Sequence, residues 1–187
     1  MTPRTLSTAD ERREAVLAAA TRVSATRGLH APTLEVAKSA GISQAYLFRL
    51  YPTKADLATA LVGRCNDRVY DTFAAAAAQA RAGGDDVMQA MGRAYKELLQ
   101  DRELLLLQLH AHAASAQDPA IRETMRASFG RLVTLVEQES GAPPEQVQGF
   151  FAYGMLLNVM AALDAGELDL PWARTLMGDD DDCVPGA

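Results

Sequence analysis

Helix-forming segments punctuated by glycine and proline constrain this chain more than any other feature. Runs rich in Ala, Leu, Glu, Gln and Arg recur along its 187 residues, and most of them start near Ser, Thr, Asp or Pro and stop near Gly. No run of β-branched residues alternates with polar ones over the length of a strand. The pattern therefore predicts an all-α protein and disfavours an α/β enzyme.

The start and stop signals predict about nine helices. Gly28, Gly41 and the pair Gly83-Gly84 end three of them, and Asp118-Pro119 supplies an N-cap and a first-turn proline for a later one. The expected helices span about residues 10–27, 33–40, 43–51, 54–82, 85–100, 101–116, 119–140, 143–165 and 171–177.

Charge divides the chain into two unlike parts. Residues 1–54 hold eight Lys/Arg and four Asp/Glu, a net charge of +4, whereas the remainder holds ten and twenty, a net charge of −10. The total of −6 conceals this difference. A basic N-terminal unit on an acidic body is expected when only one end of a protein meets phosphate.

The two cysteines and the lack of a long apolar run bear on compartment. Cys65 lies inside an expected helix and Cys183 near the end of the sequence, and their spacing fits neither a zinc site nor a disulfide framework. The first residues hold no apolar stretch leading to a cleavage site, and the longest apolar run, 150–159, is too short to span a bilayer. We expect a cytoplasmic protein with no cofactor, metal or membrane partner.

The segment from Thr33 to Lys54 carries the strongest local signal. Two short helices, the first with Thr33 as its N-cap, flank a sharp turn at Gly41. Ile42 and Leu47 fill the angle between the helices, and a proline that follows ends the second one. Such a helix-turn-helix makes its second helix a ridge that fits the major groove of DNA.

The first residues of that ridge suit base edges. Gln44 can bond adenine bidentately, and Ala45 and the ring of Tyr46 can touch thymine methyl groups. Residues with hydroxyl or cationic side chains on either side suit phosphates. The predicted DNA-binding residues are Thr33, Ser43, Gln44, Ala45, Tyr46, Phe48, Arg49 and Lys54. A helical hairpin with no DNA role is the alternative, since glycine between two amphipathic helices is common in bundles.

The same segment resembles the TetR family of transcriptional regulators. The family pattern is an Ile/Val-Ala pair, two residues, Ala-Gly-Val-Ser, and then Leu-Tyr-x-x-Phe-x-x-Lys with a leucine shortly after. The matching residues here are Val36-Ala37, Ala40-Gly41-Ile42-Ser43, Leu47-Phe48, Tyr51, Lys54 and Leu57. Phe48 replaces the usual tyrosine, whose hydroxyl commonly meets phosphate, and Leu50 replaces a frequent histidine. The resemblance covers about residues 10–57.

The resemblance implies a homodimeric repressor, not an enzyme, that binds palindromic double-stranded operator DNA and is released by a small-molecule ligand. It implies a three-helix DNA-binding domain at residues 1–53 and a helical ligand-binding and dimerisation domain at 54–178. The run of aspartates at the end of the sequence predicts an acidic, disordered tail at 179–187. Two other hypotheses stay open. One is a metal-binding or enzymatic helical bundle with an incidental helix-turn-helix, and the other is a ligand-independent DNA-binding activator.

Candidates for the implied ligand cavity combine apolar bulk with occasional polar groups. They are Met88, Met91, Tyr95, Leu99, Leu106, His110, Phe129, Tyr153 and Leu157. His110 and His112 are two residues apart, which on a helix points them about 200° from each other, so we expect no shared metal.

The segment from Phe150 to Leu163 is apolar in nearly every helical direction. One stripe can face the subunit's own core while another needs a partner, although a helix buried wholly within one subunit is the alternative. The predicted dimer residues are Phe150, Gly154, Leu157 and Ala161.

Overall fold

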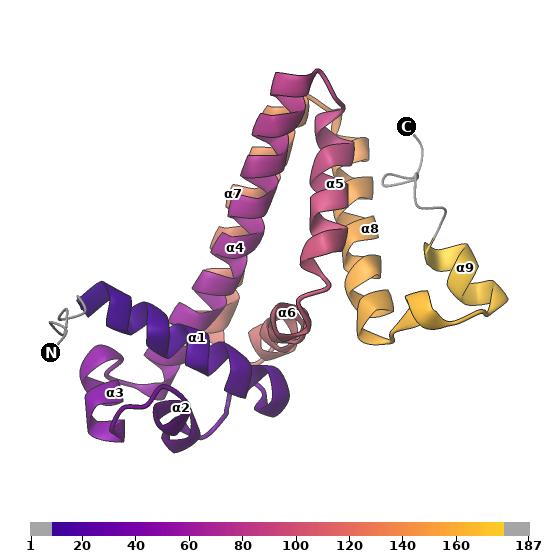
Figure 1. Ribbon diagram of the computed structural model, residues 1–187. Coiled ribbons are helices and arrows are strands. Elements are labelled where there is room, and N and C mark those ends of the chain that lie inside the picture. Colours follow the sequence, from indigo (N-terminus) through magenta and orange to yellow (C-terminus); the bar gives the residue numbers. More distant parts are fainter. Residues whose placement is uncertain (1–8, 178–187) are drawn as a thin grey trace, which may run out of the picture.

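The computed structural model describes residues 9–177, and in this range the chain folds into helices without a strand (Figure 1). The helices are α1 (Ala9–Arg27), α2 (Thr33–Ser39), α3 (Gln44–Leu50), α4 (Lys54–Gly83), α5 (Val87–Leu98), α6 (Arg102–Ser115), α7 (Pro119–Ser140), α8 (Pro144–Ala162), the short 3₁₀ turn η1 (Ala165–Glu167) and α9 (Pro171–Met177). The all-α prediction is confirmed. The acidic tail predicted at 179–187 lies outside the described residues.

Local capping bonds start and end several of these helices where the sequence indicated. Thr53 and Asp56 form a reciprocal capping box at the start of α4, and Gly84, with φ +77°, ends that helix. The Asp118 carboxylate accepts two backbone N–H bonds at the start of α7. Such bonds satisfy the donors that a first turn leaves free, so short stretches of sequence suffice to place these ends.

The end of α8 differs from the prediction. The helix stops at Ala162, three residues short of the predicted end at 165, and Asp164 takes a left-handed conformation with φ 51°. Arg102 holds this turn, since it pairs with Asp164 Oδ1 at 2.6 Å and donates to Ala161 O at 3.0 Å. The pairing joins residues 62 positions apart, so no local pattern encodes it.

The body of the molecule, which we define as α4–α9, is built around α4. This long helix packs along α5 and α7 and meets α1 near its first turns (Figure 1). α6 lies at the end of the body nearest to α1, and it contacts α1 as well as α4, α7 and α8. α8 packs on α5, and α9 packs on α8. α6 therefore touches the N-terminal helices and the body together.

One buried cluster runs from the N-terminal helices into the body. It extends from Leu47 of α3 through Leu61 and Phe73 of α4 to Met91 of α5. The Phe73 ring meets Tyr95 edge to face, with centroids 5.6 Å apart. Close packing of this kind transmits a shift of one helix to its neighbours. Among residues 9–177, no helix is both long enough and apolar enough to cross a bilayer.

Candidate nucleic-acid interface and ligand cavity

A tight turn at Gly41 joins α2 to α3. Gly41 has φ +66°, a conformation that glycine adopts freely because it has no Cβ. Ile42 N donates to Ala37 O at 3.0 Å, and Leu47 is fully buried between the helices. These bonds and contacts fix the angle at which α3 stands out from the protein.

The first turn of α3 is capped, and its outer face is open to solvent. Ser43 Oγ accepts a bond from Tyr46 N at 3.1 Å. Gln44, Ala45 and Arg49 are exposed, and Phe48 is 38% exposed. This face can therefore reach base edges in a major groove.

Thr33 is the first residue of α2, so its prediction as the N-cap is wrong. Pro32 takes the extended N-cap backbone, and no side-chain bond caps the helix there. The Thr33 hydroxyl instead accepts a bond from Gln44 Nε2 at 2.8 Å. The bond links α2 to α3 and holds the Gln44 amide in a defined position.

The Tyr46 ring lies between two guanidinium groups. Its hydroxyl accepts a bond from Arg12 Nη1 at 3.0 Å, and Cζ of Arg12 and of Arg49 each lies 5.9 Å from the ring centroid. Arg12 belongs to α1, 34 residues before Tyr46. The contact ties α1 to α3 and places positive charge beside the exposed face of α3.

Lys54, at the start of α4, holds the loop that precedes α2. Its ammonium donates to His30 O at 2.5 Å, and the residue is exposed. Because an ammonium has three N–H donors, Lys54 can bond this carbonyl and a phosphate together.

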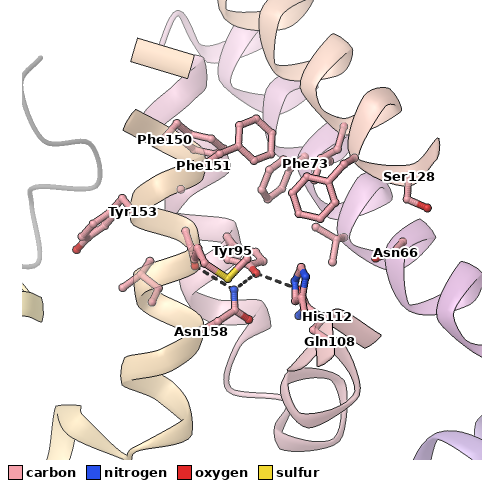
Figure 2. A pocket seen from close by; sticks show the side chains of 17 residues that line it. Asn66, Phe73, Tyr95, Gln108, His112, Ser128, Phe150, Phe151, Tyr153 and Asn158 are labelled. Atoms are coloured by element: carbon pink, nitrogen blue, oxygen red, sulfur yellow. Dashed lines mark hydrogen bonds between the residues drawn. The ribbon is translucent and has the colours of Figure 1, made fainter. Parts of the chain in front are cut away.

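A cavity lies in the body between α4, α5, α6, α7 and α8 (Figure 2). It is lined by Asn66, Val69, Phe73, Gly92, Tyr95, Gln108, His112, Ser128, Phe129, Leu132, Phe150, Phe151, Tyr153, Gly154, Met155, Leu157 and Asn158. This mostly apolar, aromatic wall with a few amide and hydroxyl groups has the character of a small-molecule site.

Three polar side chains form a buried chain of hydrogen bonds in the cavity wall. Asn158 Nδ2 donates to Tyr95 Oη at 2.6 Å, and the Tyr95 hydroxyl donates to Gln108 Oε1 at 3.1 Å (Figure 2). Burial raises the pKa of Tyr95 to about 12, against a smaller lowering by its bond from Asn158. The phenol is therefore neutral at physiological pH.

The two histidines of α6 face different surroundings. His112 lines the cavity, with its ring centroid 5.8 Å from that of Phe129, and burial lowers its pKa. His110 Nε2 lies 3.3 Å from Ala25 O, near the end of α1. α6 thus presents one histidine to the cavity and the other to α1.

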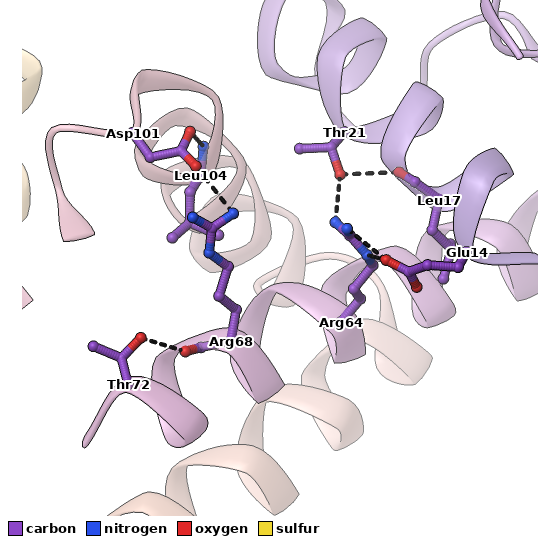
Figure 3. Close-up of polar contacts among 8 residues, drawn as sticks. All are labelled: Glu14, Leu17, Thr21, Arg64, Arg68, Thr72, Asp101 and Leu104. Atoms are coloured by element: carbon purple, nitrogen blue, oxygen red, sulfur yellow. Dashed lines mark hydrogen bonds and ion pairs between the residues drawn. The ribbon is translucent and has the colours of Figure 1, made fainter. Parts of the chain in front are cut away.

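Two arginines one turn apart on α4 also join the N-terminal helices to the body (Figure 3). Arg64 pairs with Glu14 at 2.6 Å and donates to Thr21 Oγ1 at 3.3 Å, both on α1. Arg68 pairs at 3.1 Å with Asp101, whose carboxylate caps α6. α4 therefore contacts α1 and the start of α6 through neighbouring turns.

The N-terminal part of the chain matches a known family. The model of bacterial regulatory proteins of the tetR family matches residues 16–61, which include α2, the turn and α3. Over these residues the chain has the N-terminal domain that defines this family, and the resemblance seen in the sequence is confirmed there.

Solved structures share this fold along most of the chain. A TetR family member from Streptomyces coelicolor A3 is 22% identical, with a TM-score of 0.72, and the match covers 94% of this chain and 99% of that one. A transcriptional regulator from Rhodococcus sp. Rha1 is 22% identical, with a TM-score of 0.66, and coverages of 83% and 84%. The multidrug binding protein EbrR complexed with ethidium is 22% identical, with a TM-score of 0.67, and coverages of 89% and 96%. No curated protein sequence matches the chain.

In this tetR-type N-terminal part, the predicted DNA-binding residues gather on and beside α3. Ser43 to Arg49 belong to α3 and its cap, Thr33 is bonded to Gln44, and Lys54 begins the next helix. Arg12 was not among the predicted residues. Its place beside Tyr46 depends on how α1 packs over α3, and only the positive charge of the N-terminal part pointed to it.

The predicted ligand residues divide between the cavity and other places. Tyr95, Phe129, Tyr153 and Leu157 line the cavity. Met88, Met91, Leu99, Leu106 and His110 do not; the first three are buried elsewhere, Leu106 is half-buried, and His110 faces α1. Sequence reasoning missed Gln108 and Asn158. Each is a polar residue inside an otherwise apolar helical segment, and this pattern could have indicated a buried polar group.

The predicted dimer residues mostly face the core of their own subunit. Phe150 and Leu157 are 6% and 5% exposed and line the cavity, and Gly154 lies against the Tyr95 ring. Ala161 is half-buried and packs against the core. The exposed apolar stripe of α8 is displaced around the helix from these residues and consists of Met155, Val159 and the C-cap residue Leu163.

Proposed function

We propose that this protein is a DNA-binding transcriptional regulator: a cytoplasmic homodimeric repressor of palindromic operators, released from DNA by a small molecule bound in the cavity. α3 enters the major groove, where Gln44 reads adenine and Ala45 contacts a thymine methyl group. Arg49 and Lys54 bind phosphates on either side. The exposed, capped face of α3 supports this placement.

The homodimer forms, in this proposal, through the exposed stripe of α8. Met155, Val159 and Leu163 are 38%, 43% and 57% exposed, and their spacing of four residues places them on one side of the helix. A contiguous apolar stripe of this kind favours burial against a partner. Two-fold symmetry then presents two copies of α3 to the two halves of a palindrome.

The position of α6 is the observation that carries the proposal of ligand release. Gln108 and His112 bring this helix into the cavity wall, whereas His110 lies against the end of α1. A ligand that pushes or draws α6 must therefore alter its contact with α1. Because α1 is bonded to α3 through Arg12 and Tyr46, the shift changes the position of the DNA-reading helix.

The energy required for this switch is modest. A coupling of about 1–3 kcal/mol between the two sites changes DNA affinity by roughly 5–150-fold. Movement of both copies of α3 away from groove register loses base contacts in both half-sites. EbrR, which shares the fold, has been solved with proflavin and with ethidium bound, which supports a ligand role for the cavity.

Selection of binding sites from random double-stranded DNA tests the DNA part of the proposal. The expected result is a palindrome, bound with an affinity that falls steeply as salt concentration rises. Gln44→Ala is the informative variant, and Gln79→Ala, at an exposed position of α4, is its control. Recovery of no preferred sequence would overturn the proposal.

Sedimentation velocity tests the dimer. Val159→Glu places a charge in the centre of the α8 stripe and is expected to yield monomers with weakened operator binding. Ala78→Glu adds the same charge to an exposed position of α4 and should leave the dimer intact. A Val159→Glu protein that stays dimeric excludes this face as the interface.

A further inference from the structure

The direction of every hydrogen bond in the cavity's polar chain follows from one carbonyl group. Asn158 Nδ2 lies 3.0 Å from Gly154 O, which can only accept, so this atom of the Asn158 amide is the nitrogen. Its second N–H donates to Tyr95 Oη. The Tyr95 proton is then directed to Gln108, whose facing atom must be the amide oxygen.

These hydrogen bonds leave one acceptor and one donor of the three side chains without a partner. Asn158 Oδ1 and Gln108 Nε2 are buried and have no hydrogen-bond partner among residues 9–177. Their residues are only 2% and 7% exposed, and both line the cavity. A buried polar group without a partner is costly, so a ligand that bonds both atoms relieves an existing cost.

The charge of the lining limits what can enter. Among the described residues that line the cavity there is no Asp, Glu, Lys or Arg. One charged group beside the lining is the Lys96 ammonium, whose Nζ is 5.9 Å from the Tyr153 ring centroid. An ion that moved from water into this cavity would lose its hydration without gaining an opposite charge from the lining. The cavity is therefore suited to uncharged molecules.

We propose that the ligand is an uncharged aromatic molecule that donates one hydrogen bond to Asn158 Oδ1 and accepts one from Gln108 Nε2, the chemistry of an aromatic lactam or amide. The inference rests on the proposed function, in which this cavity is the regulatory site. The aromatic part of the ligand packs against the rings of Phe73, Phe129 and Phe150.

Three compounds with one ring system test the inference by isothermal titration of the full-length protein. Phenanthridinone is an uncharged lactam with adjacent N–H and C=O groups, phenanthridine keeps only an acceptor, and N-methylphenanthridinium is a permanent cation. We expect phenanthridinone to bind about tenfold more tightly than phenanthridine, equivalent to about 1.4 kcal/mol. The cation is expected to bind most weakly.

Gln108→Glu is the decisive variant. It keeps an oxygen that can accept from Tyr95 but replaces the unpartnered donor with an acidic oxygen. We expect affinity for phenanthridinone to fall about tenfold and affinity for the cation to rise. The preference for phenanthridinone over the cation should therefore become smaller or reverse. Gln79→Glu adds the same group at an exposed site and should change neither affinity.

Two results would overturn the inference. One is binding of the cation to the unmodified protein at least as tightly as phenanthridinone, and the other is the absence of any preference among the compounds, lack of binding included. Operator binding, measured on the same samples by fluorescence anisotropy, judges the proposed function separately. A protein that binds its palindrome but prefers the cation retains the proposed function and refutes the lactam assignment.

Discussion

Replacement of Tyr95 by phenylalanine removes one oxygen atom from the centre of the buried polar chain. The loss leaves an N–H of Asn158 and the Oε1 atom of Gln108 without the partner they now have. Each buried polar group left unpaired costs about 1–3 kcal/mol. The phenol hydroxyl itself no longer has to be desolvated, so we expect Tyr95→Phe to lower the free energy of unfolding by about 2–4 kcal/mol.

Denaturation by urea, with the slope m compared between proteins, measures this change. Tyr153→Phe is the matched control, because the Tyr153 hydroxyl makes one part-buried bond, to Met177 O at 2.9 Å. Its expected cost is about 0.5–1.5 kcal/mol. A Tyr95→Phe protein no less stable than Tyr153→Phe would refute the reasoning that the Tyr95 hydroxyl is the buried partner of both Asn158 and Gln108.

Asn158→Leu completes a double-mutant cycle with Tyr95→Phe. If the two side chains interact as the structure shows, the double variant should be more stable than the sum of the single losses predicts, by about 1 kcal/mol. Simple additivity would contradict the 2.6 Å bond between them.

Three further predictions concern DNA binding and pH. Gln44→Ala should lower operator affinity by about 1–3 kcal/mol and relax the preference at one base pair, as measured by anisotropy with single-base operator variants; an unchanged preference would contradict base reading by this residue. Arg49→Ala should weaken binding to all sequences alike and reduce the salt slope by about 1, whereas an unaltered slope would exclude a phosphate contact. Burial raises the pKa of Cys65 to about 12 from 9.0. As pH rises above 9.0 the unfolded thiol ionises while the folded one keeps its proton, so unfolding becomes easier. Cys65→Ala removes this contribution. Between about pH 8 and 10, its free energy of unfolding, measured by denaturant titration, should fall by about 1.4 kcal/mol less than that of the unmodified protein. Equal falls in the two proteins would refute the raised pKa of Cys65.

The sequence by itself determined the order and nature of the helices and the helix-turn-helix. The turn and cap residues Gly41, Ser43 and Thr53 act through hydrogen bonds and backbone conformations within a few residues of themselves. A short segment of sequence is therefore enough to predict their roles. The exposed face of α3 follows from the same segment, because Leu47 fixes which side of that helix is buried.

Tertiary structure alone decided which side chains meet across helices. Helical periodicity shows that one face is apolar, but it does not show whether that face meets a packed core or a hollow. Asn158, Tyr95 and Gln108 come from three helices, with 63 and 13 positions between the bonded pairs, and their chain exists only because α8, α5 and α6 converge. The same is true of Arg12 and Tyr46, whose bond spans 34 positions.

The dimer stripe shows the same division within one helix. Apolar residues in nearly every direction of α8 indicated two buried sides, and this much was local information. Which residues belong to which side depends on the rotation of α8 against α5, which buries Phe150 and Leu157 and leaves Met155 and Val159 exposed. That rotation is set by packing between distant segments, where contacts are decided by shape and not by sequence spacing.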